Sequence, residues 1–442
     1  MRVHDFVAVG IGPFNLGLAC LTEPLDLDGV FLEGRPEFDW HPGMMLDDAT
    51  LQVPFLADLV TMADPTSPFS FLNFLKDTGR LYSFYIRESF YPLRREYNDY
   101  CRWAAERLTS LRFGQYVERV EHDGTSYVVR TSTGDVFRSR RLVLGVGTSP
   151  VVPEVAGPLV EDSTKEPTPA TSGVAIHTAD YLEHRETLRS LASVTVVGSG
   201  QSAAEVYADL LDTLAPGQAL NWITRSPRFF PMEYTKLTLE MTSPEYTAYF
   251  QALPEATRED LLREQKGLYK GISSDLVDQI FDRLYEKRVS GGVDTTMVTG
   301  SELVAARLEE QADGSAYVLE LHHHESDQDF VLRTEGLVLA TGYAAEVPSF
   351  LDPVRDRIRW DDRDRFVASS TFAVDLEGSE IFVQNAEEHT HGFVAPDLGM
   401  GAHRNATLIA AMLGREVYPL EKRVAFQHFG VPDHLRVMEG AE

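Results

Sequence analysis

The pattern of apolar and polar residues contains the same unit twice. Residues 6–9 are a short apolar run that enters the glycine turn GIGPFN, after which apolar residues recur at helical spacing. Residues 194–197 enter the turn GSGQSA in the same way, and a second apolar-periodic segment follows. A short apolar strand, a tight glycine turn and a helix in this order are typical of a dinucleotide-binding βαβ unit. The pattern therefore predicts two such units in one chain.

Two similar strand ends, LVLGVGT at 142–148 and LVLATGY at 337–343, each close a block that opens with a glycine turn. Inside the second block, residues 233–291 carry helical periodicity and many charges, whereas residues 297–337 return to short strands. The polar segment 161–173 is rich in Pro, Thr and Ser and is typical of a surface loop near a domain crossing. We therefore expect an α/β fold with two Rossmann-like dinucleotide-binding domains, the second inserted in the first, and a small helical region.

The net charge of the chain limits the classes of partner that it is expected to bind. Its 442 residues include 40 Lys and Arg against 68 Asp and Glu, a formal net charge of −28. Such a surface repels phosphate backbones and anionic lipids and attracts small cations, so we expect neither nucleic-acid nor membrane binding. General acidity is also a common adaptation for solubility or salt. We find no run of about 18 apolar residues and no signal peptide, and Cys20 and Cys101 make no CxxC or zinc spacing. A cytoplasmic protein is expected.

The residue that ends the second strand differs between the two units. In the first unit, residues 30–32 lead into Glu33, about 20 residues after the turn, where a carboxylate accepts both hydroxyls of an unphosphorylated ribose. In the second unit, residues 220–224 lead into Arg225, with Ser226 and Arg228 beside it. Guanidinium groups bind a ribose 2′-phosphate that a carboxylate would repel. The two sites together favour FAD in the first unit and NADPH in the second, although Arg225 could simply decorate a strand end.

We therefore expect an FAD-binding domain at 1–165 and 335–442 and an NADPH-binding domain at 166–334, whose helical insertion at about 233–291 binds substrate. A disulfide reductase needs two redox thiols beside the flavin, and the chain has no such pair. The FxGxxxHxxxW signature of Baeyer–Villiger enzymes is absent between the two turns. A flavin monooxygenase of another type and a flavin reductase are the classes left open.

Six motifs occur in order along nearly the whole chain: GIGPFNL (10–16), WHPGM (40–44), LQVPFLADLV (51–60), DPTSPFSFLNFL (64–75), ATGY (340–343) and HTHG (389–392). Together they resemble the siderophore N-hydroxylating flavin monooxygenases, which act on lysine, ornithine or diamines, and most of all the cadaverine N-hydroxylases of desferrioxamine pathways. The resemblance implies FAD, NADPH and O2 as reactants and a C4a-hydroperoxyflavin that hydroxylates a neutral amine. It also implies a hydroxamate siderophore pathway and a homo-oligomer, commonly a tetramer.

The resemblance further implies which residues hold the cofactors. Gln52 would lie near both the flavin and the amine, which makes it the catalytic candidate. The cofactor-binding candidates are Gly10, Gly12, Pro13, Asn15, Glu33, Trp40, His41, Met44, Gln52, Gly198, Gly200, Gln201, Ser202, Arg225, Ser226, Arg228, Thr341, Gly342, Tyr343 and Leu398. For Trp40 and Met44, ordinary core packing is an equal alternative.

The substrate-binding candidates are Gln52, Ala57, Leu239, Leu268 and Gly399. Amino-acid hydroxylases of the family carry lysine at the position of Ala57, and the ornithine branch carries asparagines and a serine at positions aligned with Leu239, Leu268 and Gly399. Burying an α-carboxylate among apolar side chains is costly. The sequence therefore favours a diamine, cadaverine or putrescine. L-Lysine N6-hydroxylation and a non-oxygenating reductase or regulator are the alternatives.

A diamine would carry a second ammonium far from the reacting nitrogen. That ammonium needs an anion or a carbonyl in place of the absent lysine, and the acidic candidates are Glu233, Glu240, Asp397 and Asp58.

No metal site is expected. His322, His323 and His324 lie in a predicted strand, where consecutive side chains face opposite sides. His389 and His391 would share one face of an extended segment, but no cysteine or carboxylate cluster with metal spacing accompanies them. The resemblance makes that segment an FAD or active-site loop.

Overall fold

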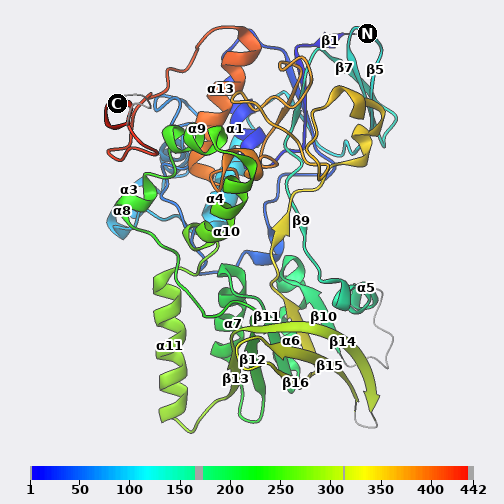
Figure 1. The fold of residues 1–442 in the computed structure, drawn as a ribbon, viewed down its shortest axis with the longest axis vertical. Helices are drawn as coiled ribbons and strands as arrows, with labels where there is room; N and C mark the ends of the chain where they lie inside the picture. Colours follow the sequence, from blue (N-terminus) through cyan, green and yellow to red (C-terminus); the bar gives the residue numbers. More distant parts are fainter. Residues whose placement is uncertain (1, 165–172, 312–313, 437–442) are drawn as a thin grey trace, which may run out of the picture.

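The first unit is built on a parallel five-stranded sheet (Figure 1). The computed structural model describes residues 2–164, 173–311 and 314–436. In sheet order the strands are β19 (Ile381–Val383), β8 (Leu142–Leu144), β2 (Phe6–Val9), β3 (Gly29–Leu32) and β4 (Leu111–Arg112). These strands are short apolar runs because both faces of the sheet are covered.

The two faces of this sheet have different covers. Alternate strand residues such as Phe6 and Phe31 face the helices α1 (Pro13–Thr22), α4 (Arg94–Ala105) and α13 (Gly401–Leu413). Their neighbours Val7 and Val30 face a second sheet and the 3-10 segment η5 (Ser349–Arg357). That sheet has the order β1 (Val3–His4), β7 (Val136–Ser139), β6 (Tyr127–Thr131) and β5 (Val117–His122).

The second unit repeats the parallel arrangement. Its five strands, in sheet order, are β10 (Val174–His177), β17 (Gly336–Leu339), β11 (Ser193–Val197), β12 (Ala219–Ile223) and β13 (Asp294–Val298). One face packs on α6 (Tyr181–Ser190), α7 (Gln201–Thr213) and α11 (Ser274–Val289). The other packs on a meander of β14 (Ser301–Gln311), β15 (Gly314–His323) and β16 (Gln328–Thr334). Two parallel sheets of this kind confirm the predicted α/β class.

The chain passes between the units along a narrow two-stranded connection. β9 (Ser149–Pro150) pairs antiparallel with β18 (Tyr343–Ala344) between the upper and lower parts of Figure 1. The expected return to the first unit at residue 335 is too early, because β17 pairs with β10 and β11 of the second unit. The expected loop 161–173 also differs at its start, since α5 (Gly157–Thr164) is helical there. Residues 165–172 of that loop lie outside the described residues.

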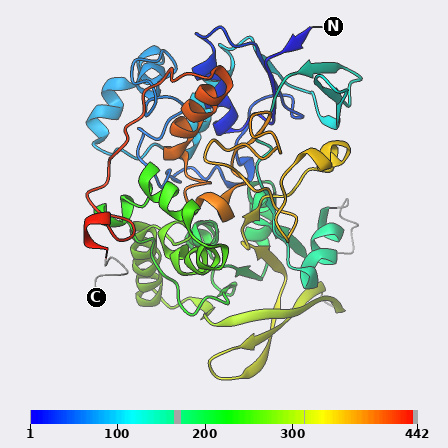
Figure 2. The same cartoon turned by 45° about the horizontal axis from the view of Figure 1, so that its top comes forward.

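The expected helical insertion is present and joins the two units. It contains α8 (Lys236–Leu239), α9 (Pro244–Ala252), α10 (Glu255–Glu264) and the 3-10 segment η4 (Gln265–Leu268), followed by α11. α9 packs Tyr246 and Phe250 against Phe393, Val394 and Met400 of the first unit. Figure 2 shows these green helices beside the C-terminal part of the chain. In the part of the chain that is described, no helix is long and apolar enough to cross a bilayer.

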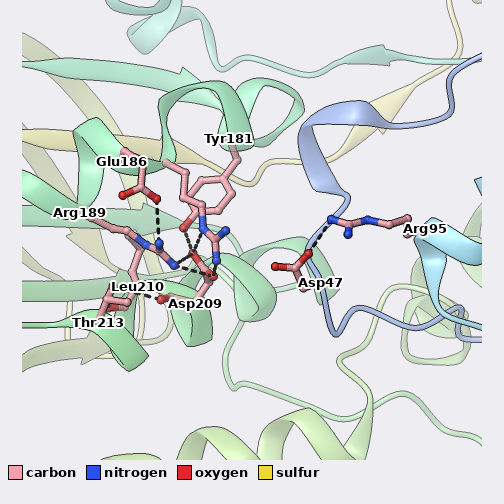
Figure 3. A network of polar contacts seen from close by, with 9 residues as sticks. Asp47, Arg95, Tyr181, Glu186, Arg189, Asp209, Leu210 and Thr213 are labelled. Atoms are coloured by element: carbon pink, nitrogen blue, oxygen red, sulfur yellow. Dashed lines mark hydrogen bonds and ion pairs between the residues drawn. The ribbon is translucent and has the colours of Figure 1, made fainter.

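One carboxylate fixes the orientation of α7, the helix that follows the second glycine turn. Asp209 accepts hydrogen bonds from the Tyr181 hydroxyl at 2.5 Å and from Arg185 Nε at 2.9 Å, and Arg189 adds a third donor (Figure 3). All three donors belong to α6. α6 and α7 are therefore held together by a charged network as well as by apolar packing.

Candidate active site

The first glycine turn leaves room for a ligand at the start of α1. Gly10 has a φ of 86°, and a Cβ there would stand 2.3 Å from the carbonyl oxygen of Gly145, so only glycine fits. A Cβ at Gly12 would meet no atom within 4 Å. Pro13 opens the helix, whose free backbone N–H groups make a site for a pyrophosphate.

Glu33 stands at the edge of this turn, directly after β3. Its Oε2 accepts the N–H of Ile11 at 2.9 Å, and its Oε1 accepts the N–H of Arg35 at 3.0 Å. The carboxylate is therefore oriented by the backbone, and its remaining lone pairs can accept ribose hydroxyls. Asn15 has a different role, because it is fully buried and its amide donates to the Gly10 carbonyl at 2.8 Å. It shapes the turn and does not face a ligand.

The second glycine turn has the same construction. Gly198 has a φ of 152°, and a Cβ there would stand 2.2 Å from the Ala340 carbonyl oxygen. Gly200 precedes α7, whose first two residues are Gln201 and Ser202. At Gly200, the nearest atom to an added Cβ would be the Lys270 carbonyl oxygen of the helical insertion, at 3.5 Å.

Two cations stand beyond the strand next to this turn. Arg225 and Arg228 are exposed after β12, and no described carboxylate pairs with the Arg225 guanidinium. Ser226 donates its hydroxyl to the Arg228 carbonyl at 3.0 Å, which orders this segment. The two arginines can bind the phosphate of a phosphorylated ribose, since ligands of parallel sheets bind at the carboxyl ends of the strands.

The WHPGM motif joins the two units. A Cβ at Gly43 would lie 1.7 Å from the Ala179 carbonyl oxygen, so the backbones of the units touch there. Met44 is buried in the core of the second unit, which is the core-packing alternative given for it. Trp40 packs 5.4 Å from the Tyr97 ring, in the first unit.

Histidine and tyrosine rings lie where the chain crosses between the units. The His41 ring is 5.6 Å from Tyr343, whose other neighbour is His177 at 5.1 Å. His41 is accessible but enclosed on most sides, and this enclosure together with Arg94 lowers its pKa to about 4. Gly342 has a φ of 87°, and the Thr341 hydroxyl donates to the Val151 carbonyl. These two residues brace the β9 and β18 pair, and His41 stays neutral at pH 7.

Gln52 lies at the point where both units and the helical insertion meet. Its Nε2 donates to Gln201 Oε1 at 3.1 Å, and that oxygen also accepts the N–H of Ser273 at 2.8 Å. Beside them, Arg94 of α4 and Glu205 of α7 form a bidentate ion pair with distances of 2.9 and 2.7 Å. Sequence reasoning missed this pair, although the QSAAE spacing places Gln201 and Glu205 on one helix face.

The structure brings two of the substrate candidates together. A Cβ at Gly399 would stand 3.8 Å from Ala57 Cβ, and Ala57 is 6% exposed. Leu398 packs on the core of the first unit. Leu239 and Leu268 lie on the helical insertion, where Leu268 packs in the cluster around Phe393. Ala57 and Gly399 therefore lie close together and bring no charge of their own, and the nearest atom to a Cβ at Gly399 is Asp397 Oδ1 at 3.2 Å.

Of the four acidic candidates, Asp397 is the one placed at this point. Its Oδ1 accepts the Gly399 N–H at 2.7 Å, and its charge helps to raise the pKa of Tyr234 on the helical insertion. No described donor pairs with its Oδ2.

The other three acids lie elsewhere. Asp58 is buried and accepts from the backbone of Val60, Thr61 and Phe71, so it belongs to the core. Glu240 holds residues 426–427 of the C-terminal segment. Glu233 is exposed beside Gly267.

The HTHG segment begins with a short helix in which Thr390 and His391 are buried, so the two histidines do not lie on one face of an extended segment. α12 (Glu388–His391) directs His389 to the Phe366 carbonyl at 2.8 Å and stacks His391 on Phe372 at 4.6 Å. Behind it, Arg404 and Glu387 form an ion pair at 3.2 Å that is almost completely buried. Neither residue was predicted, because nothing local in the sequence marks a charge as buried.

Comparison with known proteins places this geometry among amine hydroxylases. The family model described as L-lysine 6-monooxygenase/L-ornithine 5-monooxygenase matches residues 2–345. A cadaverine monooxygenase of the desferrioxamine pathway from Erwinia amylovora, solved with FAD, is 50% identical with a TM-score of 0.92. The match covers 99% of that chain and 98% of this one. A putrescine N-hydroxylase of Shewanella oneidensis is 44% identical over 97% of this chain and 84% of its own. The ornithine N-hydroxylase of Kutzneria sp. 744, solved with reduced FAD, NADP+ and L-ornithine, has a TM-score of 0.82 at 27% identity, over 94% of this chain and 100% of its own.

Proposed function

Because the chain belongs to the L-lysine 6-monooxygenase/L-ornithine 5-monooxygenase family, we propose that it N-hydroxylates one terminal amine of a diamine, cadaverine or putrescine. The reaction uses FAD, NADPH and O2 and serves hydroxamate siderophore biosynthesis. The observation that carries the proposal is that two uncharged residues, Ala57 and Gly399, lie together with the carboxylate of Asp397 beside them. Such a site lacks a cation for a substrate carboxylate and offers an anion for a second ammonium.

The residues of each unit fit the cofactor assigned to it. The open Gly12 turn and the oriented Glu33 carboxylate suit FAD in the first unit, which we divide as residues 1–165 and the chain after β17. Gly200, Arg225 and Arg228 suit NADPH in the second unit, between these segments. When bound, FAD reduced by NADPH supplies the activation of O2.

The protein itself must prepare the amine. A terminal ammonium with a pKa of about 10.4 costs roughly 4 to 5 kcal/mol to deprotonate at pH 7, so the site has to favour the neutral form. Burial of the reacting nitrogen, away from Asp397, does so, because burial disfavours the charged form of an amine. The helical insertion closes the site against water through its packing of Tyr246 and Phe250 on the first unit.

The remote ammonium, unlike the reacting amine, has to stay charged. It keeps its charge by pairing with Asp397. Ala57 and Gly399 add no cation there, and Arg404, whose charge also acts on Asp397, is ion-paired with Glu387. An amino acid would place its carboxylate near the same uncharged residues and near Asp397, where it would be repelled. The site therefore discriminates against L-lysine and L-ornithine on charge.

Exposed apolar residues and buried free cysteines support what we propose for the assembly and location of the enzyme. Tyr82, Tyr85 and Ile86 are exposed together on α3 (Leu81–Arg87), a surface that suits a contact between copies of the chain. We propose a homo-oligomer, a tetramer, which light scattering on a size-exclusion column would measure directly. Cys20 and Cys101 are free and buried, in keeping with a cytoplasmic enzyme.

The first test offers cadaverine, putrescine, L-lysine and L-ornithine separately to FAD-loaded protein. Hydroxylamine formation is measured with NADPH and O2 consumption. Product from the diamines alone is expected, and its rates rank the two chain lengths. Product from L-lysine or L-ornithine at comparable kcat/KM would refute the charge argument. Peroxide without hydroxylamine from all four would refute the proposed function.

A further inference from the structure

The amide of Gln201 has only one possible orientation. Its Oε1 accepts the backbone N–H of Ser273 at 2.8 Å, and a backbone N–H can only donate. Its Nε2 donates to Glu205 Oε1 at 3.0 Å, and a carboxylate can only accept. Two partners with fixed roles therefore agree, one from the helical insertion and one from α7. Turning the Gln201 amide by 180° would exchange its nitrogen and oxygen and break both hydrogen bonds.

Glu205 is itself held in place from the first unit. Arg94 reaches it with two nitrogens, and the same guanidinium donates to the Met44 carbonyl at 2.7 Å. The side chains of Arg94 and Glu205 are 13% and 5% exposed, so water does not compete for these bonds. The series of contacts that ends at Gln201 thus begins at the buried ion pair of Arg94 and Glu205, which joins the two units.

The contacts from Arg94 through Glu205 to Gln201 also fix the orientation of Gln52. It meets Gln201 Oε1 at 3.1 Å, and because that oxygen accepts, Gln52 must present its Nε2 there. Its own Oε1 is then turned away from Gln201 and has no donor within the described parts of the chain. Gln52 consequently presents its Oε1 acceptor on the side away from Gln201, while the second N–H of its Nε2 has no described acceptor.

We propose that Gln201 is a positioning residue that makes Gln52 present its carbonyl oxygen to the reacting amine; this inference rests on the proposed N-hydroxylation. A neutral amine that donates an N–H to Gln52 Oε1 keeps its lone pair free to receive the oxygen atom. A reversed Gln52 amide would donate to that lone pair and block it. Both orientations bind the amine, but only one allows the reaction.

The test compares variants in which residue 201 does or does not accept a hydrogen bond. Gln201→Leu removes the acceptor, so Gln52 can turn. The conservative exchange Gln201→Glu keeps an acceptor opposite both Ser273 and Gln52 and leaves the Arg94–Glu205 ion pair in place. Cadaverine affinity is measured by calorimetry on FAD-loaded protein without NADPH. Hydroxylamine formed per NADPH consumed is measured separately, because this yield does not depend on how fast NADPH binds.

Gln201→Leu is expected to leave the cadaverine Kd within about threefold and to lower the yield by about tenfold, as a misplaced reacting group does. The exchange variant should recover most of the yield. The double variant Gln52→Leu with Gln201→Leu should be no worse than Gln52→Leu alone, because Gln201 acts through Gln52.

Three results would overturn the inference while leaving the proposed function intact. These are a wild-type yield in Gln201→Leu, an equal loss in the exchange variant, or additive losses in the double variant. A wild-type enzyme that makes no hydroxylamine from any diamine would overturn the proposed function and this inference together.

Discussion

Replacing Asp397 by asparagine tests the charge argument directly. Asparagine keeps an oxygen that can accept the Gly399 N–H, which Asp397 accepts at 2.7 Å, so the backbone at 397–399 should keep its conformation. What is lost is the negative charge opposite the remote ammonium. Two unit charges about 4 Å apart attract by roughly 4 kcal/mol at an effective dielectric constant of about 20. Desolvation offsets part of this, which leaves about 2 kcal/mol, or about a 30-fold loss in kcat/KM for the diamine.

Pentylamine provides the matched control substrate, since it has the reacting amine of cadaverine but no second charge. Asp397→Asn should leave its kcat/KM unchanged, so the preference of the wild type for cadaverine over pentylamine should shrink by the same 30-fold. Glu233→Gln is the matched control variant, because Glu233 is another acidic candidate on the helical insertion and is exposed beside Gly267. Equal losses for cadaverine and pentylamine would refute the pairing. A loss in Glu233→Gln alone would move the remote ammonium to that residue.

Three further predictions follow from the same geometry. Ala57→Lys, at a position 6% exposed beside Gly399, should raise kcat/KM for L-lysine and lower it for cadaverine in amine-hydroxylation assays; no gain with L-lysine in folded, FAD-loaded protein would contradict the missing-cation argument. Arg225→Ala should raise the KM for NADPH by about tenfold or more and leave that for NADH unchanged, because a charged hydrogen bond is lost only with the 2′-phosphate; equal changes would contradict it. Burial raises the pKa of Asp397 above its usual value of 3.8, despite the opposing effects of the Gly399 N–H and Arg404. The ionised carboxylate is therefore less stable in the folded state, and the free energy of unfolding falls as the pH rises from about 3.8 through the raised pKa. Asp397→Asn should therefore have a Tm equal to or above that of the wild type at pH 7, with the difference vanishing below about pH 4, and a lower Tm at pH 7 would contradict this sign.

Local features of the fold could be predicted from the sequence. A strand, a glycine turn and a helix are neighbours in the chain, and the residue that ends the next strand follows about 20 positions later. Glu33 and Arg225 accordingly stand at the predicted strand ends, and Gly10 and Gly198 occupy turns that exclude any side chain. Periodicity also predicted the helical insertion, because a helix repeats its pattern over a few residues.

The sequence by itself therefore determined the class of the protein, its two glycine turns and the absence of a cation at Ala57. Only the tertiary structure decided which residues meet. It placed β17 in the second sheet, packed the helical insertion on the first unit, and turned the carboxylate of Asp58 to the backbone N–H of Phe71 in the core. The contact of Gln52 with Gln201 joins residues that are 149 positions apart. Such contacts depend on how the two units dock, which is set by the sum of many packing interactions and leaves no periodic or local pattern along the chain.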